Sequence, residues 1–237
     1  MPAICTAGRH TKDRIEGQEV PSASSQLRRK IHLCKADTPL DRDDQVGIAH
    51  YRDYLCYLHQ TIRASIPLMA CAIERCSIDR PVELRLRAYL ARHIEEEAGH
   101  AELLMDDLIT TGLSREQVLS LPPGPAVTRM VGAQYYWILH HSPFALLGYI
   151  AFLEGTPPTA QALDFWKTAT GLPPAAFCCL VLHAGADPRH WRELDCFIDS
   201  LPLPDSELAL IGQSAMQTAQ LAGDAWHALK QGWGLRP

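Results

Sequence analysis

Apolar residues recur at intervals of three and four over most of the chain, and this spacing restricts the fold more than any other feature of the sequence. It is clear in residues 41–76 and 205–232, whereas no segment of useful length alternates apolar and polar residues with a period of two. A spacing of three and four places apolar side chains on one face of an α-helix. The sequence therefore predicts an all-α protein, an irregular bundle of about seven or eight helices.

Proline and glycine mark the expected ends of these helices. Residues 80–112 are predicted to form one long helix, because Pro81 stands near the start and Gly112 just past the end. A second apolar helix is expected over 130–156, bent at Pro143. Shorter helices are predicted for residues 158–171, 173–185 and 187–201.

The composition changes near residue 40. Residues 1–40 are polar and irregular, so we expect a mobile or loosely docked N-terminal arm there. Residues 41–237 have an ordinary proportion of apolar residues and are long enough for one sizeable core. The sequence predicts a single helical domain over that range.

Charge and hydropathy narrow the expected partners. The net charge of -5 gives no reason to expect nucleic acid or an anionic membrane. No window approaches the roughly 18 uninterrupted apolar residues of a membrane-spanning helix, and the N-terminal residues lack the apolar core of a secretory signal. We therefore expect a cytoplasmic protein with a small-molecule substrate, without nucleic-acid or membrane partners. A homodimer is compatible with the sequence.

The first candidate metal motif is His93, Glu97 and His100. On one helix, positions i, i+4 and i+7 lie within about 60° of one another, so one face presents two imidazoles and a carboxylate. A buried carboxylate between two imidazoles needs partners, and a divalent cation supplies them. The alternative is a solvated acidic face, since other glutamates occupy the same segment: Glu95, Glu96 and Glu102.

A second motif, His183, Asp187 and His190, repeats the spacing and the order of residue types. Imidazole and carboxylate together suit non-haem iron, and zinc or manganese also bind them. The alternative for Asp187 is a helix N-cap, because Pro188 follows it at the first helical position. Gly185 also argues against one regular helix carrying both histidines.

Glu154 is the third element of the candidate site. It ends an apolar helical segment, where a carboxylate costs free energy unless it is paired or exposed. By itself, it would be interpreted as an exposed residue before the helix stop at Gly155. Beside the two histidine motifs, a carboxylate that bridges two metal ions is the better hypothesis.

Three segments resemble a known family. HIEEEAGHAELLMDDL, MVGAQYYWILHHSPFALLGYIAFLEG and HAGADPRH are similar to the haem-oxygenase-like diiron oxidases and oxygenases, also called iron-containing redox enzymes. The likeness covers roughly residues 46–201. It implies a haem-oxygenase-like fold and the metal ligands Glu97, His100, Glu154, His183, Asp187 and His190. His93 stands where some members carry a glutamate ligand.

The resemblance also implies a chemistry. Members of this family hold two Fe(II) ions and use O2 as a co-substrate, so we expect a non-haem iron oxidase or oxygenase. Its substrate would be a small organic molecule such as an amino acid or fatty acid derivative. Gly185 and Pro188 depart from the family motif and leave open whether one or two metal ions bind.

Two other hypotheses stay open at this point. One is a haem-oxygenase-like scaffold that binds haem, or no metal at all, and has a binding role. The other is a ferritin-like carboxylate diiron protein, which the pairs Glu97–His100 and Asp187–His190 partly fit together with Glu154. The ferritin-like layout also needs a first-helix glutamate about 30 residues before Glu97, where the sequence reads IRASIPLM.

Overall fold

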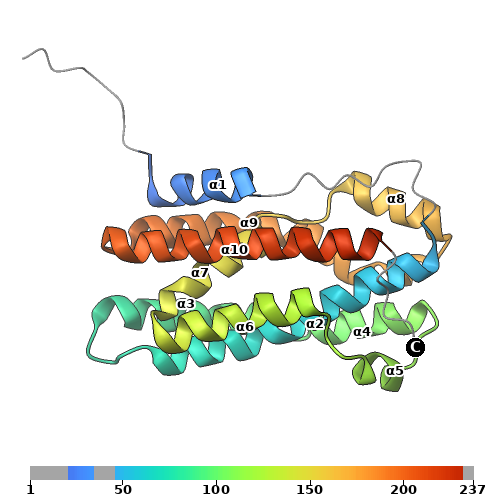
Figure 1. The fold of residues 1–237 in the computed structure, drawn as a ribbon, viewed down its shortest axis with the longest axis horizontal. Helices are drawn as coiled ribbons and strands as arrows, with labels where there is room; N and C mark the ends of the chain where they lie inside the picture. Colours follow the sequence, from blue (N-terminus) through green and yellow to red (C-terminus); the bar gives the residue numbers. More distant parts are fainter. Residues whose placement is uncertain (1–20, 35–45, 232–237) are drawn as a thin grey trace, which may run out of the picture.

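The computed structural model describes residues 21–34 and 46–231, and every regular element in these ranges is a helix (Figure 1). The prediction of an all-α protein is confirmed. The α-helices are α1 (Ala23–Cys34), α2 (Ile48–Arg75), α3 (Pro81–Glu97), α4 (His100–Thr110), α5 (Arg115–Ser120), α6 (Pro125–His140), α7 (Leu146–Glu154), α8 (Ala160–Thr170), α9 (Cys178–Ser200) and α10 (Asp205–Lys230), with the 3-10 helices η1 (Pro143–Ala145) and η2 (Pro174–Ala176).

The helices form two layers with α7 between them. Helices α1, α9 and α10 run along one side of the molecule, and α2, α3, α4 and α6 along the other (Figure 1). Helix α7 is buried along almost its whole length and packs mainly on α10. No helix of the described residues is long and apolar enough to cross a bilayer.

The long helix predicted for residues 80–112 is interrupted in its middle. Helix α3 ends at Glu97, and α4 begins at His100. Gly99 has a φ of 91°, a left-handed conformation that other residues adopt at a cost. The prediction of one helix was wrong here because Gly99 allows the chain to change direction between the ligand candidates Glu97 and His100.

Helix α9 shows the opposite difference. Two helices were predicted, over 173–185 and 187–201, but α9 runs from Cys178 to Ser200 through Gly185 and Pro188. A proline inside a helix removes one backbone hydrogen bond, and tertiary packing of this helix outweighs that loss. Asp187 therefore lies inside a helix, and the N-cap role considered for it was wrong.

The N-terminal region contains structure that the predicted irregular arm did not include. Helix α1 buries Leu27 and Ile31 against the core. Its first turn is fixed to α9, because the Ser24 backbone N–H and hydroxyl donate to the two carboxylate oxygens of Asp199 at 2.8 and 2.7 Å. The rest of the predicted arm, residues 1–20 and 35–40, lies outside the described residues.

Gly148 marks the closest approach of α7 to α10, and its replacement by alanine should destabilise the fold. An added Cβ would overlap the backbone of α10 at Ile211 and Ala215. Overpacking against a backbone costs roughly 2 kcal/mol or more, so we expect G148A to lower Tm by about 4–8 °C. G132A in α6 is the matched control, since its Cβ would meet nothing within 4 Å. It should raise stability slightly, as Gly to Ala does in helices; equal Tm values for the two variants would contradict this account.

Candidate metal centre

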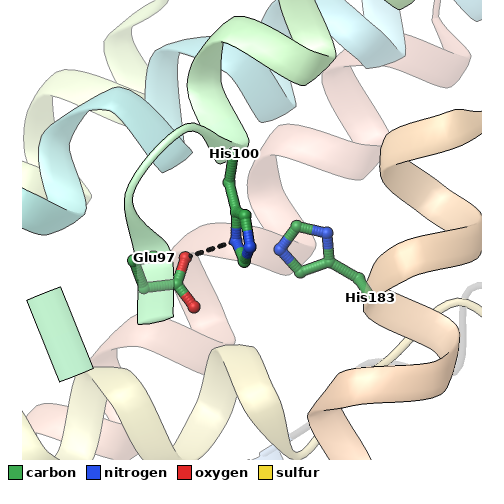
Figure 2. A group of neighbouring side chains, drawn as sticks. All are labelled: Glu97, His100 and His183. Atoms are coloured by element: carbon green, nitrogen blue, oxygen red, sulfur yellow. Dashed lines mark hydrogen bonds and ion pairs between the residues drawn. The ribbon is translucent and has the colours of Figure 1, made fainter. Parts of the chain in front are cut away.

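Glu97, His100 and His183 converge between the two layers. One potential ligand atom of each lies within 4.8 Å of the other two. Ligand atoms bound to one first-row metal ion are at most about 4.4 Å apart, so the three atoms would have to approach one another to bind the same ion. Figure 2 shows that they come from the end of α3, the start of α4 and the early part of α9. The two imidazole rings meet edge-on, with their centroids 4.9 Å apart.

His183 is held in the form that a metal ligand needs. Its Nδ1 lies 2.9 Å from the carbonyl oxygen of Cys179, one turn earlier on α9, and donates to it. This bond leaves Nε2 with a free lone pair. Burial lowers the pKa of His183 and favours the neutral ring, which is the form that binds metal.

Glu97 and His100 are paired across the break at Gly99. His100 Nδ1 lies 2.9 Å from Glu97 Oε2 (Figure 2). Burial alone would raise the pKa of Glu97, but the hydrogen bond and the charge of His100 outweigh it and lower the pKa. The left-handed conformation of Gly99 therefore brings Glu97 and His100 together, two residues that the sequence analysis had placed on one face of a regular helix.

A second group of side chains lies around Glu154. It is the last residue of α7 and is buried, so the exposed position considered from the sequence was wrong. His93 Nε2 lies 3.0 Å from Glu154 Oε1, and His190 Nδ1 lies 3.9 Å from the same oxygen. Glu154 Oε2 and His190 Nδ1 are buried without a hydrogen-bond partner. Such atoms are costly unless an ion or water binds them.

Asp187 lies close enough to both groups for their charges to shift its pKa. Burial raises its pKa, the carboxylates of Glu154 and Glu97 raise it as well, and together these effects bring it to about 8. Asp187 is not one of the three residues within 4.8 Å. Two buried acidic side chains, Glu154 and Asp187, and the partly buried Glu97 thus share one region. A divalent cation would offset their mutual repulsion.

The raised pKa of Asp187 predicts how the metal-free protein responds to pH. The unfolded carboxyl titrates near pH 4 and the folded one at about 8, so the folded state binds the proton more tightly. Stability should therefore fall as pH rises from about 4 to about 8. D187N removes this loss, and with a chelator present its Tm should exceed that of the wild type by roughly a few degrees at pH 8. The gap should shrink toward pH 5; an equal gap at both pH values would argue against a buried protonated Asp187.

His93 contacts a residue that the sequence interpretation placed in a solvated face. Glu96 Oε2 lies 3.5 Å from His93 Nδ1 and 3.8 Å from His190 Nε2. Burial opposes protonation of His93, but the hydrogen bond to Glu154 and the surrounding carboxylates outweigh it and raise its pKa. Glu96 therefore belongs to the surroundings of the second group.

Asp107 links two of the ligand helices and was not identified from the sequence. It is fully buried on α4 and accepts hydrogen bonds from the first two backbone N–H groups of α9, those of Cys178 at 3.1 Å and Cys179 at 2.8 Å. These N–H groups have no partner within their own helix. A signal exists in the sequence, because Asp107 follows His100 by seven residues and shares the apolar face of α4 with Leu104.

Arg28 makes a similar link at the other end of α9. Its guanidinium donates to Asp195 Oδ1 at 2.9 and 2.7 Å and to the carbonyl oxygen of Ala151 on α7 at 2.5 Å. Asp195 follows His190 by five residues, and Ala151 precedes Glu154 by three. Helix α1 therefore fixes the two elements that carry the second group of ligand candidates.

All seven residues named from the sequence thus lie around one region of the bundle. Glu97, His100 and His183 form one group, and His93, Glu154 and His190 form the other, with Asp187 near both. The donor set of imidazoles and carboxylates fits iron. The unpartnered buried atoms of Glu154 and His190 fit it as well.

Comparisons with solved structures identify the fold. A domain of unknown function with a haem oxygenase-like fold from Shewanella denitrificans superposes with a TM-score of 0.71 at 17% identity, covering 89% of this chain and 90% of that one. A TenA homologue from Pseudomonas syringae pv. tomato gives a TM-score of 0.63 at 16% identity, covering 91% and 97%. At these identities the likeness shows the fold, which is haem-oxygenase-like and not ferritin-like.

Of the two sequence comparisons, only the one with protein families found a match. No curated protein matches the chain. The model of one family, described as iron-containing redox enzyme, matches residues 56–223, which include all seven ligand candidates. The match covers well over half of the sequence, and the chain belongs to the family of iron-containing redox enzymes.

Proposed function

We propose that the protein is a non-haem iron oxidase or oxygenase that uses O2 to oxidise a small organic substrate, with two Fe(II) ions as its cofactor. The observation that carries the proposal is the convergence of Glu97, His100 and His183 within 4.8 Å. The family match supports the choice of iron over other divalent ions.

Each ion would have its own group of residues. Glu97, His100 and His183 would hold the first, and Glu154 would lie between it and a second ion bound by His93 and His190. Asp187 would join this second group, since its carboxyl is buried beside Glu154 and Glu97. Iron held by imidazoles and carboxylates supplies the electrons and the open coordination positions that O2 activation requires.

The chain's own side chains prepare the site for this chemistry. The Cys179 carbonyl fixes the tautomer of His183 and leaves its Nε2 free to bind metal. Arg189 Nη2 donates to His190 Nε2 at 3.0 Å, and this contact would have to break for His190 to bind metal through Nε2. The candidate ligands His93, Glu97, Glu154, His183 and Asp187 face one cavity whose walls are mainly apolar. Such walls exclude water from a reactive centre and admit an organic substrate.

Metal loading tests the proposal. Purified metal-free protein is incubated anaerobically with Fe(II), desalted and analysed for iron, and O2 uptake is then followed after mixing with air-saturated buffer. We expect close to two irons per chain and O2 consumption that depends on them. One iron per chain would remove the second site from the proposal. No bound iron, or a Soret band on haem titration, would favour the haem-binding or metal-free scaffold.

A further inference from the structure

The cavity that reaches the candidate metal centre is large and opens at one end of the bundle. Its volume is about 1520 Å³, more than the roughly 300–1,000 Å³ of a typical small-molecule site. Its inner end includes Glu97, Glu154 and His183. Helix α8 lies at one end of the bundle (Figure 1) and contributes exposed wall residues on one helical face: Gln161, Asp164 and Thr168. We take this face as the mouth of the cavity.

Among the described residues that line the cavity, the charged side chains other than histidine are all acidic, and there is no lysine or arginine. These described residues include four carboxylates, of which Glu97, Glu154 and Asp187 belong to the candidate metal centre. Asp164 is the fourth and stands at the mouth. A carboxylate or phosphate entering the metal-free cavity would lose its hydration without gaining an ion pair from these residues.

Aromatic side chains form a continuous cluster on the wall of the same cavity. Tyr54 of α2 stacks on Trp166 of α8 at 5.7 Å and meets Trp226 of α10 edge-on at 5.7 Å. Phe165, the neighbour of Asp164, lies 5.6 Å from Trp166. All four aromatic residues line the cavity. Aromatic faces attract organic cations, and more strongly when the site is partly desolvated.

We propose that the substrate of this site is an amphiphilic amine, with its cationic amino group at Asp164 and the aromatic cluster and its apolar body directed along the cavity toward the metal centre. This inference rests on the proposed function for the reaction, but it concerns binding and does not need the metal. It narrows the range of amino acid and fatty acid derivatives to molecules that carry a positive charge at the end remote from the metal.

Neutral amphiphiles and fatty acids should both bind less tightly than an amphiphilic amine. A neutral molecule with the same apolar body would gain the same burial but no attraction to Asp164. A fatty acid would place its carboxylate either against Asp164 or among the buried acidic groups of an unmetallated centre, and both positions are repulsive. The amine should therefore bind most tightly and the carboxylate least.

The test uses three probes that share one alkyl chain: octylamine, 1-octanol and octanoate. Their Kd values are measured by calorimetry on the metal-free full chain, at low salt and near neutral pH. We expect octylamine to bind about fivefold or more tightly than octanoate. Octanoate binding as tightly as octylamine would overturn the proposal, as would the absence of octylamine binding.

Variants at the mouth of the cavity test whether Asp164 causes the preference for octylamine. D164N should weaken octylamine about threefold and leave 1-octanol unchanged, and D164K should favour octanoate over octylamine. D224N is the matched control, because Asp224 lies next to the cavity residue Gly223 but pairs with Arg129 at 3.6 Å. An unchanged octylamine Kd in D164N would exclude recognition by this carboxylate.

The two proposals fail in different ways. If the chain binds no iron but keeps the amine preference, the proposed oxidation is wrong and the binding inference stands. If it binds two irons and consumes O2 but prefers octanoate, the reaction class stands and the substrate class is wrong.

Discussion

Replacing His183 by alanine is expected to lower the affinity of the protein for Co(II), used as an air-stable substitute for Fe(II), by at least about 100-fold. The loss of a residue that merely orients a metal ligand costs roughly 10–100-fold, and His183 is proposed as a ligand itself. Its Nε2 is left free by the hydrogen bond from Nδ1 to Cys179. The visible absorption of bound Co(II) and the iron content after anaerobic loading measure the effect.

His227→Ala is the control for this experiment. His227 is exposed on α10, where its Nδ1 bonds only to the backbone carbonyl of Gly223 in the same helix. H227A should bind Co(II) as the wild type does, and both variants should unfold cooperatively. Equal Co(II) affinity in H183A and the wild type would remove His183 from the centre and leave the group around Glu154 as the one to test.

Replacing Asp107 by alanine is expected to damage both stability and metal binding. The change leaves the backbone N–H groups of Cys178 and Cys179 without acceptors in a buried position. Loss of a helix cap costs about 1–2 kcal/mol, which corresponds to a fall in Tm of about 2–8 °C. Because Asp107 joins α4 to the start of α9, His100 and His183 should also lose their register, lowering Co(II) affinity about tenfold or more.

The neighbouring residue provides the comparison. Asp106 is exposed on α4, and within the described residues its side chain makes no hydrogen bond to α9. D106A should change Tm and Co(II) affinity little, whereas D107N, which keeps one acceptor oxygen, should fall between the wild type and D107A. A lower Tm with unchanged Co(II) affinity in D107A would mean that Asp107 stabilises the fold without positioning the ligands.

The fold class and the ligand candidates could be predicted from the sequence because both depend on local patterns. Apolar spacing of three and four residues gives amphipathic helices wherever it occurs. The repeated histidine–acid–histidine spacing singled out His93 to His100 and His183 to His190, and the structure brings both segments to one region. Glu154 became a candidate only beside the two histidine motifs, because by itself it was expected to be exposed; it is in fact buried.

The helix breaks could not be predicted, since they depend on tertiary contacts. Gly99 and Gly185 are both glycines inside helical patterns, yet only Gly99 adopts a positive φ. Helix α9 continues past Gly185 and Pro188 because its two ends are fixed from outside, by Asp107 and by Arg28. Neither partner is near α9 in the sequence, so no window along the chain contains the information.

The structure of residues 23–34 was missed for a similar reason. The segment is rich in charge, and its basic residues suggested a solvated arm. Only a few of its residues are buried, Leu27 and Ile31 among them, and Arg28 has partners on α7 and α9. A short helix that is stabilised by distant acceptors leaves a weak periodic signal.

The proline within α9 has a consequence for how the protein exchanges metal with solution. Pro188 has no N–H, so the carbonyl of Ala184 receives no hydrogen bond from it, and the turn that carries Asp187 is weaker than the anchored turns on either side. Such turns open locally at a lower free-energy cost than their surroundings. Opening here would separate His183 from His190 while both ends of α9 stay in place, so that an ion could enter or leave without unfolding of the bundle. Part of the ion's binding free energy would then be spent in closing this turn, and amide hydrogen exchange around Ala184 would slow when metal binds.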